Sequence, residues 1–205
     1  MHNLEIAIKN IEVQEIESAI DIFTEGFLEE PLHIMAFPET EKRKRLTRLV
    51  YELIIYHIVP EMNMKLIGAY ADGVLAGVLD YTPSDTMVSW SDSLNKAVEE
   101  MRIKANDTAI NLIGEYAMKC GSVRPVERHY YLNDIAVSRT YRGKGIGKKL
   151  FDYAEEECRQ HQDIKCIALD ATNPKNVSLY QSWGYEVFKE IEFYDLICFK
   201  MKKNL

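Results

Sequence analysis

The stretch "YRGKGIGKKL" (residues 141–150) decides how this chain is interpreted. Three glycines alternate with other residues, and basic side chains stand on both sides of them. Because glycine has no Cβ, consecutive N–H groups of such a loop can point into one concavity. A helix that begins in the loop adds unpaired N–H groups and the positive end of its dipole. The stretch predicts a pyrophosphate site, and an ordinary tight turn between a strand and a helix is the alternative.

Two common phosphate-binding loops do not fit this spacing. If Gly147 and Lys148 were the Gly-Lys pair of a nucleotide triphosphatase, its first glycine would fall on Arg142 and its Ser/Thr on Lys149. In the dinucleotide fingerprint the third glycine would fall on Lys148 or Leu150. The spacing therefore excludes both classes and leaves another phosphorylated cofactor open.

The segments around the loop predict a βαβ unit. "HYYLNDIAV" (129–137) alternates as a strand does, and "IGKKLFDYAEEECRQH" (146–161) has one apolar helical stripe. "IKCIALDA" (164–171) is a second strand, and a short helix (173–184) follows that ends at a glycine. The loop thus lies where a strand gives way to a helix.

The rest of the chain predicts more strands and helices. We expect a strand at 4–10, helices at 13–29 and 38–59, and a hairpin at 65–82 that turns at "DG". Residues 84–128 predict a helical insertion, and two strands close the chain at 185–203. The expected fold is α/β (α+β): one domain over 1–205, with a mixed, mostly antiparallel central sheet of about seven strands flanked by helices.

Composition limits the classes of function. With 205 residues, of which 47% are hydrophobic, the chain can form a substantial core. The formal net charge of −7 argues against a nucleic-acid partner. The four cysteines show no zinc spacing, which predicts no metal site and reduced, buried thiols in a cytoplasmic protein. No signal peptide or membrane span is expected.

Three blocks in order resemble the GNAT N-acetyltransferase superfamily. "RGKGIG" (142–147) matches the family signature [QR]-x-x-G-x-[GA] and directly follows "YLNDIAV" (131–137). "NPKNVSLYQSWGYE" (173–186) resembles a later block of the family, with its tyrosine at Tyr180. The resemblance covers about residues 129–190. It implies an N-acetyltransferase with acetyl-coenzyme A as acyl donor.

The resemblance also implies which residues bind the donor. Pantetheine is expected to pair with the backbone of the strand at Ile135, Ala136 and Val137, with an N–H near Ile135 polarising the thioester carbonyl. Asn173 and Asn176 are expected to contact the cofactor, although helix capping explains each of them equally well. The loop amides expected to hold the pyrophosphate belong to Arg142, Gly143, Lys144, Gly145, Ile146, Gly147 and Lys148.

The resemblance identifies the catalytic residues less directly than the donor-binding residues. Tyr180 matches the usual general acid of the family, which protonates the departing thiolate, and a tyrosine that only packs on the sheet is the alternative. Family members often place a Glu or His base at the positions of Tyr131 and Asn133, and neither residue here is a base. Strand alternation places Asp134 on the opposite face unless a bulge turns it. We therefore expect Asn133 to orient a water in a relay. Other candidate bases are Asp80, Glu115 and His129.

The acceptor is expected to be a primary amine of a small molecule or peptide. The insertion covers the acceptor side, and residues 30–37 are candidates for shaping a pocket for a longer acyl group. A non-catalytic module that binds acyl-coenzyme A is the alternative function, favoured by the missing carboxylate. A homodimer through an exposed terminal strand at 192–201 is also an expectation. Candidate lining residues of the insertion are Trp90, Glu99, Glu100, Glu115 and Tyr116.

Overall fold

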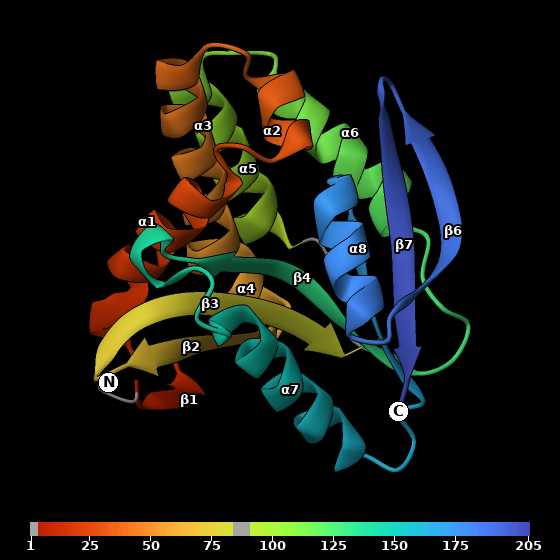
Figure 1. The fold of residues 1–205 in the computed structure, drawn as a ribbon. Coiled ribbons are helices and arrows are strands. Elements are labelled where there is room, and N and C mark those ends of the chain that lie inside the picture. Colours follow the sequence, from red (N-terminus) through yellow and green to blue (C-terminus); the bar gives the residue numbers. More distant parts are fainter. Residues whose placement is uncertain (1–3, 84–90) are drawn as a thin grey trace.

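The computed structural model describes residues 4–83 and 91–205 and contains one seven-stranded sheet. The strand order is β1-β2-β3-β4-β5-β7-β6, and only β4 and β5 run parallel. This confirms the predicted mixed, mostly antiparallel sheet (Figure 1). The strands are β1 (Ile6–Asn10), β2 (Lys65–Ala71), β3 (Val74–Pro83), β4 (His129–Val137), β5 (Cys166–Ala171), β6 (Glu186–Phe193) and β7 (Leu196–Asn204).

Helices cover both faces of this sheet. Figure 1 shows α7 on one face of β1–β4, and α1, α3 and α5 on the other. The helix α3 continues through a π-helical turn (Ile54–Ile58) into the short α4. The helices are α1 (Ile16–Phe27), α2 (Pro31–Ala36), α3 (Thr40–Leu53), α4 (Val59–Glu61), α5 (Asp92–Ala105), α6 (Ile110–Gly121), α7 (Ile146–Arg159) and α8 (Pro174–Ser182).

The core follows strand alternation, since neighbouring residues of a strand face opposite sides of the sheet. On β3, Leu79 packs in one cluster with Leu150 of α7, and Val78 packs in another with Phe23 of α1. Helix α1 approaches β4 so closely that a Cβ at Gly26 would lie 2.6 Å from the Cβ of Ala136. Only glycine fits at position 26 without displacing β4.

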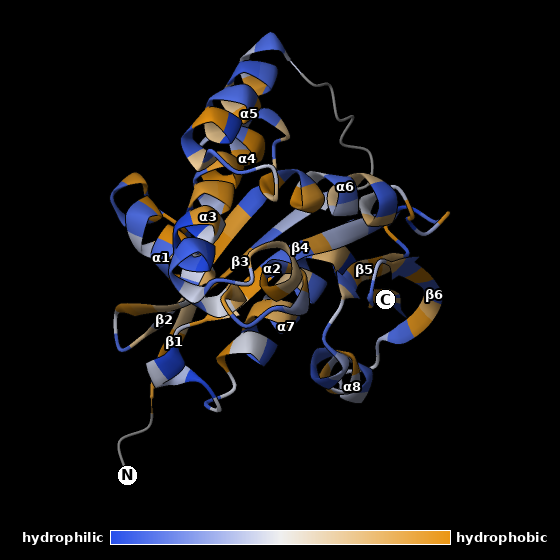
Figure 2. Ribbon diagram, turned by 90° about the horizontal axis from the view of Figure 1, so that it is seen from above, coloured by the Kyte–Doolittle hydropathy of each residue, from blue (hydrophilic) through white to orange (hydrophobic). Residues whose placement is uncertain are grey.

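The predicted insertion contains two helices, α5 and α6, which break at Asn106 in the left-handed conformation (φ 46°). Helix α5 packs against α3, while α6 packs against α2 and β6. Figure 2 shows hydrophilic and hydrophobic segments alternating along both helices, as expected for helices with one buried side. The insertion therefore covers the same side of the sheet as α1 and α3.

Two expectations need correction. Residues 30–37 contain a helix, α2, which the sequence analysis did not predict and which begins at Pro31, where proline fits the first turn. The stretch 192–201 is not one terminal strand, because the chain turns at Tyr194 (φ 50°) between β6 and β7. At this end of the sheet the edge strand is β6, while β7 lies between β5 and β6.

Candidate active site

The centre of the candidate site is a gap between the two parallel strands. Strands β4 and β5 pair only at His129 with Cys166, Tyr130 with Ile167, and Tyr131 with Ala168. Beyond these pairs β4 remains bonded to β3 as far as Val137, and β5 to β7 as far as Ala171. The sheet therefore splays at its middle and leaves one edge of β4 without a strand partner.

The backbone of β4 presents polar groups to this gap. The N–H of Asp134 donates to the Asp80 carboxylate (2.9 Å), and the N–H of Ser138 donates to Ala76 O (2.9 Å), so even positions face β3. Because backbone groups alternate along a strand, those of Ile135 and Val137 face the gap. This orientation suits the expected pairing with an amide-bearing ligand.

The glycine loop lies at the end of β4. Gly143 (φ 75°) and Gly145 (φ 78°) both have left-handed backbones, and a Cβ at either position would meet no atom within 4 Å. Gly145 is the N-cap of α7 and has no side chain, so the free N–H groups of the first turn are left open to a ligand. These residues fit an anionic group such as a pyrophosphate.

The basic side chains of the loop have their own contacts. Arg142 Nε donates to Val137 O (3.1 Å), and Lys144 Nζ lies 4.8 Å from the ring centre of Tyr141. Lys148 forms an ion pair with Asp152 one turn along α7. Their positive charge stays near the loop, where it favours an anion.

The other expected donor-binding residues lie in the core, at the start of α8, or in the lining of a cavity. Ile146 is buried in the core below α7, so only its backbone belongs to the loop. The Asn173 side chain accepts from Lys175 N (3.1 Å) and caps α8, which is the structural alternative considered for it. Asn176 and Ile135 line the cavity in the gap.

This cavity has a volume of about 330 Å³ and lies between the splayed strands, the α1–α2 region, α3, α6 and α8. It brings together residues that are far apart in the sequence. The polar residues of its lining are Glu30, His33, Tyr51, Tyr116, Arg124, Asn133, Asp134, Asp170, Thr172, Asn176 and Tyr180.

A β-bulge determines which residues of β4 reach the cavity. Asp134 pairs with Asp80, but the next pair along β3 is Tyr81 with Leu132, so Asn133 is the extra residue. As a result Asn133 and Asp134 both line the cavity. The bulge is the exception named in the sequence analysis, and strict alternation was the wrong basis for setting Asp134 aside.

The environment of Asp134 raises its basicity. Burial, with a further contribution from the charge of Asp170, raises the pKa of Asp134 to about 7, while the hydroxyl of Tyr51 donates to its carboxylate (3.3 Å) and opposes the shift. Burial and the neighbouring Asp134 raise the pKa of Asp80 well above its usual range. Both carboxyls of the pair therefore hold a proton more readily than an exposed aspartate does, and Asp134 titrates near neutral pH.

Tyr180 and Asn133, the two expected catalytic residues, both line the cavity. Burial is the main cause that raises the pKa of Tyr180, so its hydroxyl keeps its proton at neutral pH. Its ring stacks on Phe151 with 5.1 Å between ring centres. Asn133 Nδ2 donates to Thr82 Oγ1 (2.8 Å), which fixes the amide beside the bulge.

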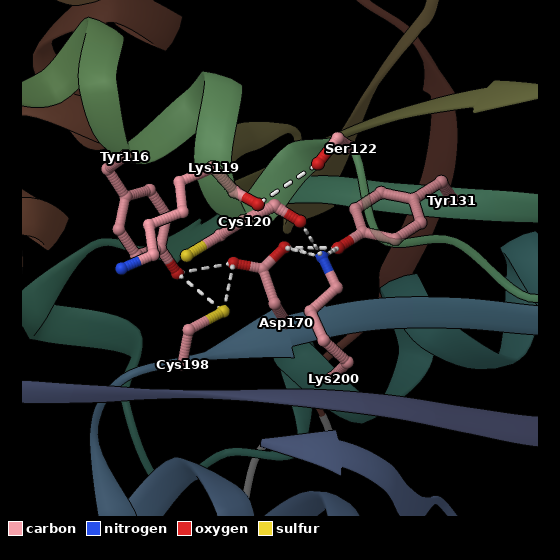
Figure 3. A network of polar contacts seen from close by, with 8 residues as sticks. All are labelled: Tyr116, Lys119, Cys120, Ser122, Tyr131, Asp170, Cys198 and Lys200. Carbon is pink, nitrogen blue, oxygen red and sulfur yellow. Dashed lines mark hydrogen bonds and ion pairs between the residues drawn. The ribbon is translucent and has the colours of Figure 1, made fainter. Parts of the chain in front are cut away.

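Figure 3 shows a buried polar network, two of whose members, Tyr116 and Asp170, line the cavity. Lys200 is fully buried and donates to Asp170 (3.3 Å), Tyr131 and the carbonyl of Cys120 (3.0 Å). Tyr116 donates to the other oxygen of Asp170 (2.6 Å). Lys200 and the two tyrosines keep the pKa of Asp170 low despite burial, so its charge is already balanced.

Most of the other expected residues lie elsewhere. Tyr116 is the one candidate from the insertion that lines the cavity, and Trp90 lies outside the described residues. Glu99 and Glu100 form surface ion pairs on α5, and Glu115 accepts from the Tyr194 hydroxyl. Each of these three glutamates is satisfied away from the gap.

The remaining candidate bases are also displaced. Asp80 is buried behind Asp134, and His129 contacts Glu127 O through Nδ1 (2.8 Å) at the opposite end of β4. The cavity instead contains Glu30, His33 and Asp170. The sequence analysis included Glu30 and His33 only in the segment 30–37 that was expected to shape a pocket, and it considered none of the three as a base. Glu30 follows a helix that already contains glutamates, so its sequence position carries no signal by itself. Asp170 is the polar residue that could have indicated a site, because it lies in a strand rich in apolar residues.

Within residues 4–83 and 91–205, no three His, Cys, Asp or Glu side chains form a group that could hold a metal ion. None of the helices in the described part of the chain has the length and apolar composition needed to cross a bilayer. All four cysteines are buried and free.

Comparison with known proteins finds a curated relative that matches part of the chain. A curated relative, N-alpha-acetyltransferase 30 of Saccharomyces cerevisiae, is 33% identical over 85 residues, which cover 41% of this chain. The aligned part spans about half (48%) of that relative.

Two solved structures share the fold. One is described as histone acetyltransferase HPA2 and related acetyltransferase from Corynebacterium glutamicum (TM-score 0.69, 19% identity, 97% of this chain and 95% of that one). The other is the PaiA N-acetyltransferase of Thermoplasma acidophilum in complex with coenzyme A (TM-score 0.61, 17% identity, 98% and 99%). The match to a protein family covers more of the chain than the alignment with the yeast relative does. Residues 29–185 match the Acetyltransferase (GNAT) family, and the chain belongs to that family.

Proposed function

We propose that this protein transfers the acetyl group of acetyl-coenzyme A to a primary amine of a small molecule or peptide. The observation that carries the proposal is the splay of β4 from β5, with the glycine loop at one end of the gap and Asp134 and Tyr180 in its lining. In this proposal the loop and the gap form the donor site, while Asp134 and Tyr180, which line one cavity, are the base and the acid.

The donor side uses mainly backbone groups. The amides of the loop from Arg142 to Lys148 hold the pyrophosphate, and the gap-facing groups of Ile135 and Val137 pair with the pantetheine amides. When bound, acetyl-coenzyme A supplies an activated thioester. The N–H of Ile135 faces the gap and donates to the carbonyl oxygen as negative charge develops there.

Asp134 acts as the general base in this proposal. An alkylammonium has a pKa of about 10.4 and must lose a proton before its nitrogen can attack. A carboxylate with a pKa of about 7 is ionised at slightly alkaline pH, yet binds a proton more strongly than an exposed aspartate does. Asn133, fixed by Thr82, orients the amine or a bridging water beside Asp134.

Tyr180 completes the transfer. As the new C–N bond forms and the C–S bond breaks, the thiolate takes the phenolic proton of Tyr180. The ammonium loses two protons in all: Asp134 accepts the first before the attack and later releases it to solvent. The second leaves the nitrogen as the amide forms and, through solvent, replaces the proton that Tyr180 gave to the thiolate. Burial keeps Tyr180 protonated until the thiolate appears, because a phenolate in this apolar setting is unfavourable.

The alternative of a non-catalytic binding module was favoured by the missing carboxylate on β4. The bulge supplies that carboxylate as Asp134, so the reason for preferring a module is gone. The name of the yeast relative specifies an α-amine acceptor, which supports keeping peptides among the acceptors to be tested.

The test is thiol release from acetyl-coenzyme A with a panel of alkylamines and peptides, together with calorimetric titration of the donor. We expect donor binding and amine-dependent thiol release. Donor binding without release on any amine would instead support the binding module, and the absence of donor binding would contradict both functions.

A further inference from the structure

We propose that Glu30 binds the ammonium group of the acceptor, and that the acceptor is an aliphatic amine that enters the cavity as a cation. The inference rests on the proposed acetyl transfer and deepens it, because it names the acceptor class. It starts from the position of Glu30 between α1 and α2, in the lining of the same cavity as Asp134 and Tyr180.

Glu30 is fixed across the gap. Its carboxylate accepts a hydrogen bond from Thr172, which directly follows β5 and lies 142 residues away in the sequence. This bond joins the helical wall of the cavity to the strand wall. A carboxylate that is held in place by a neutral hydroxyl retains oxygen lone pairs for a ligand.

The charges of the cavity single out Glu30. Asp170 is balanced by Lys200 and two tyrosine hydroxyls, and Asp134 serves as the base. Glu30 has Thr172 as its hydrogen-bond partner, and no Lys or Arg of the described chain forms an ion pair with it. Burial and the charge of Asp170 both raise its pKa, so its ionised form is costly until a cation arrives.

Two basic residues of the lining, His33 and Arg124, do not supply the positive charge that Glu30 lacks. His33 is buried, shares a hydrogen bond with Thr47 (2.8 Å) and has a pKa lowered to about 4 by burial, so it is neutral at physiological pH. Arg124 is an exposed residue whose guanidinium lies 3.3 Å from the ring centre of Tyr131. Arg124 forms no ion pair with Glu30 within the described part of the chain.

The rest of the lining suits an alkyl chain that carries an ammonium group. Phe27, Tyr51, Tyr116 and Tyr180 contribute aromatic rings, which attract cations and pack against methylene groups. Aliphatic side chains fill the spaces between them. An aromatic amine is neutral at physiological pH and would leave Glu30 uncompensated, so we expect it to be a poor acceptor.

The experiment uses two amines of nearly equal size. Ethylamine is a cation at pH 7.5, whereas 2,2,2-trifluoroethylamine is largely neutral there. We expect Glu30→Gln to lower kcat/KM for ethylamine roughly 10- to 100-fold, mainly through KM, since hydrogen bonds to charged groups are worth about 1.5–3 kcal/mol. The same variant should change kcat/KM for trifluoroethylamine by less than about threefold, because that amine brings no charge for Glu30 to bind.

A matched control separates the charge of Glu30 from the hydrogen bond that holds its side chain in place. Thr172→Val removes the hydroxyl that bonds to Glu30 but keeps the carboxylate, so it should retain the preference for ethylamine. An equal loss for both amines in Glu30→Gln, or no loss for either, would overturn the proposal.

Binding provides a readout that does not depend on turnover. Calorimetric titration of ethylamine into the protein saturated with coenzyme A should show binding to the wild type and a weaker binding to Glu30→Gln. If no amine is acetylated but this difference persists, the proposed function fails while the role of Glu30 stands. If ethylamine does not bind to the wild type, the role of Glu30 is refuted.

Discussion

Asp134→Asn tests the proposed base through both rate and stability. Asparagine has nearly the same shape, and its oxygen can still accept the hydroxyl of Tyr51, so the cavity should keep its form. It cannot accept the proton of the amine. We expect kcat to fall roughly 10²- to 10⁴-fold, the usual contribution of a general base, while the affinity for acetyl-coenzyme A stays within about twofold.

The pH dependence of the rate tests whether Asp134 acts in its ionised form. Because Asp134 must be ionised to accept a proton and has a pKa of about 7, kcat/KM of the wild type should fall about tenfold per pH unit below that value. The residual activity of Asp134→Asn should lack this decline. The assay is thiol release at amine concentrations well below KM, between about pH 5.5 and about pH 8.5.

The stability of the folded protein should change with pH in the opposite direction to the rate. The pKa of Asp134 rises from 3.8 in the unfolded chain to about 7 in the folded protein, so the folded state holds a proton that the unfolded state has lost. Stability therefore falls as pH rises through this window, and the full cost of ionising the buried group, at most about 4 kcal/mol, applies above it. Asp134→Asn avoids that cost. Urea denaturation should show it to be more stable than the wild type at pH 8, by about 1–4 kcal/mol, with a smaller difference at pH 5.

The control for this experiment is Asp195→Asn, which changes an exposed aspartate in the turn between β6 and β7. It should alter neither the rate nor the pH dependence of stability. Wild-type turnover in Asp134→Asn would remove Asp134 from the mechanism. An equal stability difference at pH 5 and pH 8 would contradict the raised pKa on which the reasoning depends.

Three further substitutions test the donor site, the acid and the buried network. Gly145→Ala and its control Gly73→Ala each place a Cβ at a similar positive φ (78° and 82°), with no atom within 4 Å. Each should therefore lower the free energy of unfolding by about 1–2 kcal/mol. Only Gly145→Ala should abolish the binding of acetyl-coenzyme A measured by calorimetry. Tyr180→Phe keeps the ring and should lower kcat at least tenfold with little change in the KM for the donor; equal turnover would exclude Tyr180 as the acid. Lys200→Met leaves Asp170 buried without its cation and should lower the free energy of unfolding by about 3–5 kcal/mol in urea, and adding Asp170→Asn should restore part of the loss.

Local patterns were sufficient to predict the strands, most helices and the position of the glycine loop between β4 and α7. The alternation of 129–137, the turn at Asp72-Gly73 and the spacing of the glycines each depend on residues close together in the chain. The structure places all of them as expected, with seven strands in the sheet. The short helix α2 escaped prediction because its six residues are too few to show a helical period.

The acceptor side could not be predicted in this way, because its chemistry depends on contacts between distant segments. Glu30 becomes a cavity residue only through Thr172, and Asp170 is balanced only because Lys200 and Tyr116 reach it from β7 and α6. The bulge that brings Asp134 into the cavity arises from a register shift between β3 and β4, which neither strand encodes alone. A carboxylate on a strand next to a glycine loop therefore should not be excluded as a candidate base by alternation, since one extra residue in the pairing is enough to bring it into the cavity.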